Sequence, residues 1–298
     1  MKRILVTGCN GFLGRAVVKL LLKKDYYVIG LSRTGTHFFH PNFKAVQIDL
    51  TKRNEIDSVD PFDVVIHLAG SVSAAESLIE PLTFVQNNIV ATANLLDFFR
   101  VRDGEGMIYV SSGKIYPIID QVCRTPYGAT KLCADLLVQE FKTSYLLPIS
   151  IIRFTGFYGP HNKLPTYPDQ SWINWFCYSN LAGRELKLYG KGVQMRDPIY
   201  ITDAANLIEK LVKNETYSLV TDVGGGLESR TSPAEVVKMI ENISGKAFSQ
   251  IIQTPLRSDM QDTFFASNKD VGFIWKPLVS IENGIRNTLT NMEAKFED

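Results

Sequence analysis

Tyr127 and Lys131 are the residues whose types and spacing most clearly suggest chemistry. They follow Pro126 at the start of a segment whose apolar period predicts a helix, so their side chains lie one turn apart on one face. A free tyrosine, with a pKa of about 10, is a poor proton donor or acceptor at neutral pH. A lysine ammonium beside it is expected to lower that pKa. The pair therefore suggests general acid catalysis, although a tyrosine and a lysine also share helix faces by chance.

Ser111 and Ser112 support this interpretation, because they follow a short apolar strand expected over residues 107–110. Ligands of open α/β sheets bind beyond the carboxyl ends of the strands, where a serine hydroxyl can hydrogen-bond a substrate oxygen. Strand-terminal serines also satisfy backbone groups, and this explains Ser111 equally well. With Tyr127 in the same chain, we expect Ser112 to bind a substrate carbonyl.

The first fourteen residues form a second pattern that suggests a ligand. An apolar strand ends at Thr7, glycines follow at Gly8, Gly11 and Gly14, and a helical period begins after Gly14. Glycine lets the backbone approach a pyrophosphate closely, and a helix N-terminus presents free N–H groups to the anion. A glycine repeat alone could be a tight turn that binds nothing. The succession of strand, turn and helix predicts the phosphate-binding turn of a dinucleotide fold.

The elements that must position these residues alternate along the chain. Apolar periods predict strands over residues 26–31, 43–48, 63–68 and 149–154, and long helices over residues 88–102 and 127–145. This alternation predicts an α/β fold with a Rossmann-type, doubly wound parallel sheet, covered by helices on both faces.

After about residue 159 the pattern changes and predicts a smaller C-terminal α/β substrate lobe. A helix is expected over residues 172–181, a strand over 186–189, and a helix over 232–243 with Ser232 as N-cap and Glu235 three residues later. Residues 217–223 form an apolar strand that returns to the main sheet. We therefore expect a dinucleotide-binding domain at 1–159 plus 200–224 and a nucleotide-sugar lobe at 160–199 plus 225–298.

Composition excludes several other functions. The formal charge of +1 on 298 residues, without a basic cluster, gives no reason to expect nucleic acid or a membrane surface as partner. The apolar run after Lys2 and Arg3 is too short for a signal peptide, and no apolar stretch approaches about 18 residues. The cysteines have no CxxC or metal-ligand spacing, so we expect free thiols, no metal site and a cytoplasmic location: Cys9, Cys123, Cys133 and Cys177.

Motifs over nearly the whole chain follow one order. The glycine turn reads TGCNGFLG, and residues 126–131 read PYGATK. Other segments are Asp49-Leu50, HLAG at 67–70, NNI with TANLL at 87–96, SSGKIY at 111–116, Arg153 with YGP at 158–160, RDPIYITD at 196–203, DVGGG at 222–226 and WKP at 275–277. In this order they resemble the motifs of the extended short-chain dehydrogenase/reductase superfamily, in the branch of nucleotide-sugar epimerases, dehydratases and reductases.

The resemblance implies roles for individual residues. Ser112, Tyr127 and Lys131 would be catalytic: Ser112 polarises a carbonyl, Tyr127 gives a proton, and Lys131 holds the nicotinamide ribose while lowering the Tyr127 pKa. Cofactor contacts are implied for Gly8, Asn10, Gly11, Phe12, Leu13, Gly14, Ser32, Arg33, Asp49, Leu50, Leu68, Ala69, Gly70, Asn88, Ser111, Tyr127 and Lys131. Substrate contacts are implied for Ser112, Gly113, Arg196, Arg257 and Asp259, although the last two are spaced one residue closer than in the family's Arg-Pro-Gly-Asp.

The end of the second strand differs from that of NAD-using members, which carry an acidic residue there. This chain has Ser32 and Arg33. A carboxylate repels a 2′-phosphate, whereas a hydroxyl and a guanidinium can bind one. We therefore expect NADP(H) as cofactor, with NAD(H) as the alternative if Arg33 is only a solvated loop cation.

Other departures narrow the reaction. Dehydratases carry Thr-Asp-Glu where Ser112, Gly113 and Lys114 stand, so the acid–base pair that eliminates water is missing. The cysteine and histidine of double epimerases would fall near Gly113 and Trp172, and 4-epimerases usually have asparagine at the place of Gly156.

These features together predict an NADPH-dependent 4-ketoreductase of a nucleotide-linked 4-keto-6-deoxy sugar. An NAD-dependent nucleotide-sugar 4-epimerase is the alternative, and a non-catalytic, cofactor-sensing binding protein is a remote one. The resemblance also implies a homodimer through the helices at 88–102 and 127–145. Leu132, Leu136 and Phe98 are candidate contacts, but core packing explains them equally well.

Overall fold

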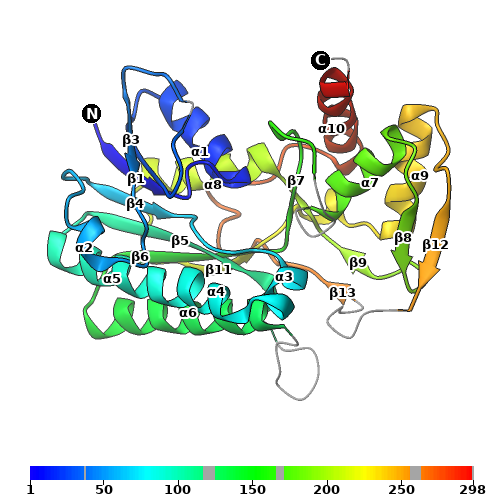
Figure 1. Cartoon of the computed structure of the whole chain (residues 1–298). Coiled ribbons are helices and arrows are strands. Elements are labelled where there is room, and N and C mark those ends of the chain that lie inside the picture. The colour runs from blue at the N-terminus through cyan, green and yellow to red at the C-terminus, as the bar shows by residue number, and fades with distance from the viewer. Residues whose placement is uncertain (37, 117–124, 166–170, 256–262, 297–298) are drawn as a thin grey trace.

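The computed structural model describes residues 1–36, 38–116, 125–165, 171–255 and 263–296. They form a larger lobe built on one sheet and a smaller lobe beyond one end of its strands (Figure 1). The chain begins in the larger lobe and its last helix stands in the smaller one (Figure 1).

The main sheet has seven strands, and every neighbouring pair is parallel. Its order is β11 (Val220–Val223), β6 (Ile149–Phe154), β5 (Gly106–Ser112), β4 (Val64–His67), β1 (Arg3–Thr7), β2 (Tyr27–Ser32) and β3 (Phe43–Gln47). The predicted strands are confirmed to within two residues, except that β11 begins three residues later than expected. Chain order reverses between β1 and β4, where Thr7 is paired with His67. Ligands of doubly wound sheets bind at such a reversal.

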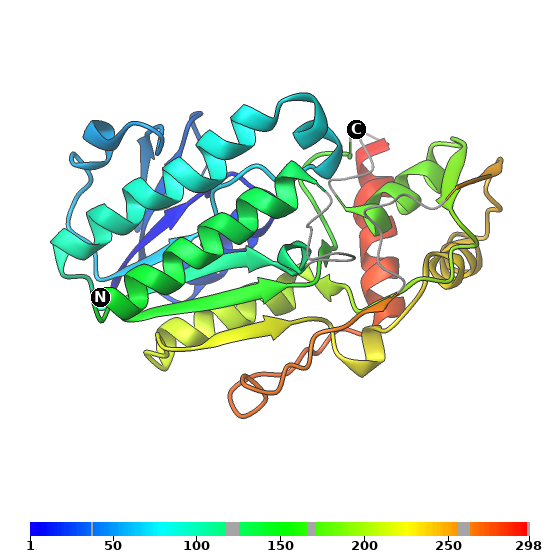
Figure 2. The same cartoon turned by 90° about the horizontal axis from the view of Figure 1, so that it is seen from below.

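Helices cover both faces of this sheet, as the alternation predicts. One face carries α1 (Phe12–Lys23) and α8 (Ile201–Lys213), and the other carries α2 (Arg53–Ile56), α5 (Ala91–Arg102) and α6 (Pro126–Ser144). Figure 2 shows α5 and α6 lying side by side across the lower face. The inner strands are therefore buried on both sides, which explains their Val- and Ile-rich sequences, whereas the edge strand β3 is partly exposed.

The helix expected over residues 88–102 begins earlier and is not regular. It follows α3 (Ala74–Ile79) and α4 (Pro81–Phe84), and a π-helical turn, η1 (Val85–Val90), precedes α5. Phe98 on α5 is fully buried in the core, so it is excluded as a dimer contact, whereas Leu136 on α6 is 55% exposed.

The smaller lobe has its own apolar core. It contains α7 (Trp172–Leu181), α9 (Pro233–Ser244), α10 (Ile281–Phe296) and the parallel pairs β8 (Leu186–Tyr189) with β12 (Ile251–Thr254) and β9 (Met195–Arg196) with β13 (Thr263–Phe264). Between the lobes, β7 (Phe157–Tyr158) pairs with β10 (Ile199–Tyr200). The predicted cap of α9 is confirmed: the Ser232 hydroxyl accepts from the Glu235 N–H, and the Glu235 carboxylate accepts from the Ser232 N–H. Two short 3-10 turns, η2 (Gly113–Ile115) and η4 (Leu227–Ser229), complete the described elements.

Cys9, Cys133 and Cys177 are free thiols, and Cys123 lies outside the described residues. Within the described part of the chain, no helix combines the length and the apolarity that a membrane crossing requires.

Candidate active site

The structure brings Tyr127 and Ser112 into contact. The Thr125 hydroxyl caps α6 by accepting the Gly128 N–H at 3.1 Å, and this fixes Tyr127 in the first turn of the helix. Ser112 ends β5, and its hydroxyl accepts the Lys114 N–H at 3.1 Å. The Tyr127 hydroxyl donates to Ser112 Oγ at 3.2 Å. Two hydroxyls from separate elements therefore meet beyond the carboxyl end of a central strand.

Tyr127 is 9% exposed, and the Phe84 ring lies edge-on to its ring with centroids 6.3 Å apart. Burial raises the pKa of Tyr127, and the hydrogen bond to Ser112 acts in the opposite direction. The expected lowering of this pKa by Lys131 is therefore not met in the structure. The phenol is instead held protonated, which is the form that donates a proton.

Lys131 is directed toward β5 rather than toward Tyr127. Its Nζ donates to Tyr109 Oη at 3.1 Å and to the Val110 carbonyl at 2.9 Å, and it lies 4.7 Å from the centre of the Tyr109 ring. Burial lowers the pKa of Lys131 to about 8, against the opposing effect of the Asp135 charge. Tyr109 was not among the predicted residues. The sequence could have indicated Tyr109, because strand alternation places it on the same face of β5 as Ser111.

The glycine turn forms a close-fitting backbone cradle. Gly8 has a φ of +66°, and a Cβ atom there would lie 2.8 Å from the Ala69 nitrogen. A Cβ atom at Gly14 would lie 2.1 Å from the Gly8 carbonyl oxygen. Gly11 is the N-cap of α1 and provides no capping side chain, so the N–H groups of the first turn, at Phe12 and Leu13, face outward from the helix end. The cradle fits a dinucleotide pyrophosphate, which needs both close approach and N–H donors.

The loop after β4 is held against this turn. Thr7 Oγ1 accepts the N–H groups of Leu68 and Ala69, both at 3.1 Å. Gly70 follows with a φ of +158°, and a Cβ atom there would lie 2.8 Å from Asn88 Oδ1.

Asn88 on η1 bonds to other parts of the protein through both ends of its amide. Its Nδ2 donates to the Ser71 carbonyl at 3.1 Å and to Thr130 Oγ1 at 3.0 Å, and its Oδ1 accepts the Ser71 N–H at 2.8 Å. Asn88 thus joins the loop after β4 to α6, and its contact to a cofactor stays a prediction. Ser111 is buried, and its cofactor contact likewise stays a prediction.

The residues after β2 lie beside the glycine turn. Asn10 Nδ2 donates to Ser32 Oγ at 3.1 Å and to the Gly35 carbonyl at 2.9 Å. Arg33 is exposed, and its Nη1 lies 3.4 Å from Asn87 Oδ1. A depression of about 640 Å³ lies beside this end of the sheet, lined by Arg33, Val46, Gln47, Ile48, Asp49, Lys52, Glu55 and Ser58. Leu50 next to it is buried.

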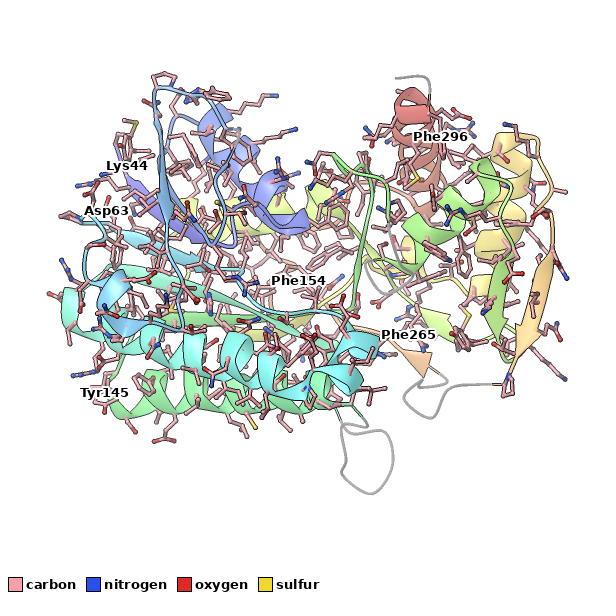
Figure 3. All side chains as sticks on the ribbon, in the orientation of Figure 1. Lys44, Asp63, Tyr145, Phe154, Phe265 and Phe296 are labelled. Atoms are coloured by element: carbon pink, nitrogen blue, oxygen red, sulfur yellow. The ribbon has the colours of Figure 1, made fainter. Side chains whose placement is uncertain are left out.

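A residue of the smaller lobe, Phe264 on β13, lies against the chain just after Ser112. A Cβ atom at Gly113 would lie 2.3 Å from Phe264 Cε1. In the β9–β13 register Phe264 is paired with Arg196, whose Nη1 donates to the Met195 carbonyl at 2.7 Å. In Figure 3, Phe154 marks the carboxyl end of β6 and Phe265 marks the chain just after β13. Arg257 and Asp259, predicted to bind substrate, lie outside the described residues.

Comparisons with known proteins show which family the chain is similar to. The model of the NAD dependent epimerase/dehydratase family matches residues 4–220. The chain is 29% identical to a UDP-glucuronate 4-epimerase of Thermodesulfobacterium geofontis, over 98% of this chain and 97% of that one. It is 27% identical to a dTDP-glucose 4,6-dehydratase of Neisseria meningitidis, over 97% and 92%. The crystal structure of a UDP-glucuronic acid 4-epimerase from Bacillus cereus, in complex with UDP-glucuronic acid and NAD, has the same fold, with a TM-score of 0.85, 23% identity and coverage of 98% and 99%.

Proposed function

Because the chain belongs to the NAD-dependent epimerase/dehydratase family, an extended short-chain dehydrogenase/reductase family of NAD(P)-dependent enzymes, we propose that it is a 4-ketoreductase. The substrate is a nucleotide-linked 4-keto-6-deoxy sugar, and the cofactor is NADPH. The hydrogen bond between Tyr127 and Ser112, 3.2 Å long, carries the proposal. It places a buried phenol and a second hydroxyl where they can both reach one carbonyl oxygen.

In the proposed reaction the sugar carbonyl lies beside these two hydroxyls. Ser112 hydrogen-bonds the carbonyl oxygen and stabilises the negative charge that develops on it. Tyr127 gives its proton to that oxygen as the alcohol forms. The raised pKa of the buried phenol keeps this proton in place until the far more basic alkoxide develops. When bound, the nicotinamide supplies the hydride that reduces C4.

The residues that would hold the cofactor are those of the glycine cradle. Gly8, Gly11 and Gly14 would admit the pyrophosphate, and Lys131 would bind the nicotinamide ribose. Ser32 and Arg33 favour NADPH, because no carboxylate ends β2 and an exposed guanidinium stands beside it.

The residues around Ser112 favour a reductase over a dehydratase. Gly113 and Lys114 provide no acid–base pair for removing water, and the space beside Gly113 is filled by the Phe264 ring. Gly156 has no side chain at the place where related 4-epimerases usually carry asparagine. Arg196 is proposed to bind the phosphates of the nucleotide sugar.

A nucleotide-sugar 4-epimerase with bound NAD is the second candidate. It uses the same three catalytic residues, and the names of the relatives favour it: the Thermodesulfobacterium geofontis protein is a UDP-glucuronate 4-epimerase. The two reactions differ in net cofactor use. A reductase consumes NADPH, whereas an epimerase retains its cofactor and gives no net oxidation.

A panel of nucleotide 4-keto-6-deoxy sugars, each assayed with NADPH and with NADH, tests the proposal. We expect loss of nicotinamide absorbance with NADPH and formation of a 6-deoxyhexose product. Tightly bound NAD in the purified protein, with interconversion of UDP-sugars and no NADPH consumption, would establish the epimerase instead.

We also propose a homodimer through α5 and α6, which light scattering of the purified protein tests.

A further inference from the structure

Lys131 has a buried carboxylate as its neighbour but does not pair with it. Asp135 lies four residues further along α6, on the same face of the helix, and is fully buried. A buried carboxylate beside a buried lysine is expected to form an ion pair with it. The Lys131 ammonium instead donates to two neutral oxygens, those of Tyr109 and Val110.

The Asp135 carboxylate is bound by Arg153 on β6. Arg153 Nε donates to Oδ2 at 3.0 Å, and Nη2 donates to Oδ1 at 2.8 Å, so both carboxylate oxygens accept from one guanidinium. Arg153 is itself held in this orientation, because its Nη1 donates to Tyr116 Oη at 3.1 Å. The Tyr116 hydroxyl in turn donates to Asp222 on β11, at 2.7 Å to Oδ1. The pair is bidentate and mostly shielded from water, with Arg153 15% exposed.

Among the residues that the structure describes, the other groups that face Lys131 carry no charge that could replace Asp135. His67 on β4 is neutral, because burial lowers its pKa to about 3. Tyr109 on β5 and Tyr127 on α6 are neutral phenols whose pKa values burial raises. Asp135 is therefore the anion that determines how strongly the Lys131 ammonium is stabilised.

We propose that Arg153 is a positioning residue: by binding both oxygens of Asp135, it prevents an Asp135–Lys131 ion pair and keeps the Lys131 ammonium at the end of β5, beside Tyr109 and Val110, where it is available to the cofactor. This inference rests on the proposed role of Lys131 in the reductase. Without Arg153, the carboxylate would be buried with no compensating charge, and Lys131, one helical turn away, would become its partner. The ammonium would then be more strongly stabilised and drawn along α6, away from the end of β5.

The titration of Lys131 tests this directly. The protein is labelled with ¹³C at lysine Cε, saturated with NADP⁺, and titrated by NMR, with the Lys131 signal assigned through its loss in Lys131→Arg. In Arg153→Met the Lys131 pKa is expected to rise by about one unit or more, the effect of an opposite charge nearby. In Asp135→Asn/Arg153→Met, which removes both charges, it is expected to return to within about half a unit of the wild-type value.

A purely structural role for Arg153 predicts a different pattern, in which both variants melt at lower temperature and the Lys131 pKa stays at its wild-type value. That result overturns the proposal, as does a double variant that keeps the shift of Arg153→Met. Arg153→Gln, which can still hydrogen-bond Asp135 without a charge, replaces Arg153→Met if the latter does not fold, and the same shift is expected. The titration needs no sugar, so a protein that reduces no 4-keto sugar can still show the shift, and a reductase without it refutes only the role of Arg153.

Discussion

The ring of Phe264 occupies the space beside the backbone of Gly113. The two residues come from different lobes, and a Cβ atom at Gly113 would approach Phe264 Cε1 to 2.3 Å. The Tyr116 ring also lies near the Phe264 ring, with centroids 5.9 Å apart. The residue next to Ser112 is therefore small because an aromatic side chain from β13 covers it.

Gly113→Asp is expected to destabilise the protein and to give no dehydratase activity. The carboxylate that dehydratases carry at this place would collide with the Phe264 ring, and overpacking of this kind costs about 1–3 kcal/mol. Urea denaturation measures the loss. Gly113→Asp/Phe264→Ala should recover most of it, because the ring is gone. A single variant as stable as the wild type would show that the ring moves aside freely.

Tyr127→Phe is expected to lower turnover by about 10²–10⁴-fold, the usual contribution of a proton donor. Cofactor affinity should change little, because the glycine cradle is untouched and the lost hydroxyl bonds only to Ser112 among the described residues. Steady-state kinetics and titration of cofactor fluorescence measure the two effects. Tyr145→Phe, just beyond the other end of α6 and 51% exposed, is the matched control and should be unchanged. Equal activity in both variants would remove Tyr127 from the mechanism.

The sequence predicts the sheet well because its strands are short, apolar and bounded by turn residues. The contact between Ser112 and Tyr127 is also predictable, since Ser112 ends β5 and Tyr127 stands in the first turn of α6, at the edge of the sheet where ligands bind. The direction of the Lys131 side chain is not, because strand alternation indicates the face of β5 on which Tyr109 lies but does not show that the Tyr109 hydroxyl accepts from the Lys131 ammonium. The contact between Phe264 and Gly113 is not predictable either, since the two residues are distant in sequence and no local pattern links them.

Arg33→Ala is expected to raise the KM for NADPH about ten- to a hundredfold and to leave the KM for NADH unchanged. A hydrogen bond to a charged group contributes about 1.5–3 kcal/mol, and only NADPH has the 2′-phosphate that the guanidinium would bind. Lys52→Ala is the matched control, because Lys52 lines the same depression but is paired with Glu55 at 3.2 Å. An equal rise of the KM for NADPH and of the KM for NADH would mean that Arg33 attracts both cofactors by its charge and does not recognise the 2′-phosphate.

Gly14→Ala is expected to abolish dinucleotide binding and to destabilise the fold. The added methyl group would lie 2.1 Å from the Gly8 carbonyl oxygen, and backbone atoms cannot rotate away as a side chain can. Gly35→Ala is a control in the loop beside the turn, because no heavy atom lies within 4 Å of its added Cβ. Isothermal titration with NADP⁺ and NAD⁺ measures binding. If Gly14→Ala keeps its cofactor affinity, the glycine turn is not the site that binds the pyrophosphate.

The free energy of unfolding is expected to fall as the pH drops from about 6.5 to about 3, partly through His67. Thr7 Oγ1 accepts two backbone N–H groups, so its own proton goes to His67 Nδ1 at 2.7 Å, and Nε2 then donates to Thr92 Oγ1 at 3.0 Å. Both ring nitrogens are thus satisfied in the neutral form. Burial lowers the pKa of His67 to about 3.

Between these pH values the unfolded chain binds a proton at His67 that the folded chain does not, so stability is lost as the pH falls. The difference corresponds to as much as about 5 kcal/mol. Urea denaturation of the wild type and of His67→Gln at several pH values measures it, because glutamine does not titrate and the carboxylates are common to both. The advantage of the wild type over the variant should shrink from pH 7 to pH 4. A constant difference across that range would mean that the pKa of His67 is the same in the folded and the unfolded chain, and would contradict the prediction.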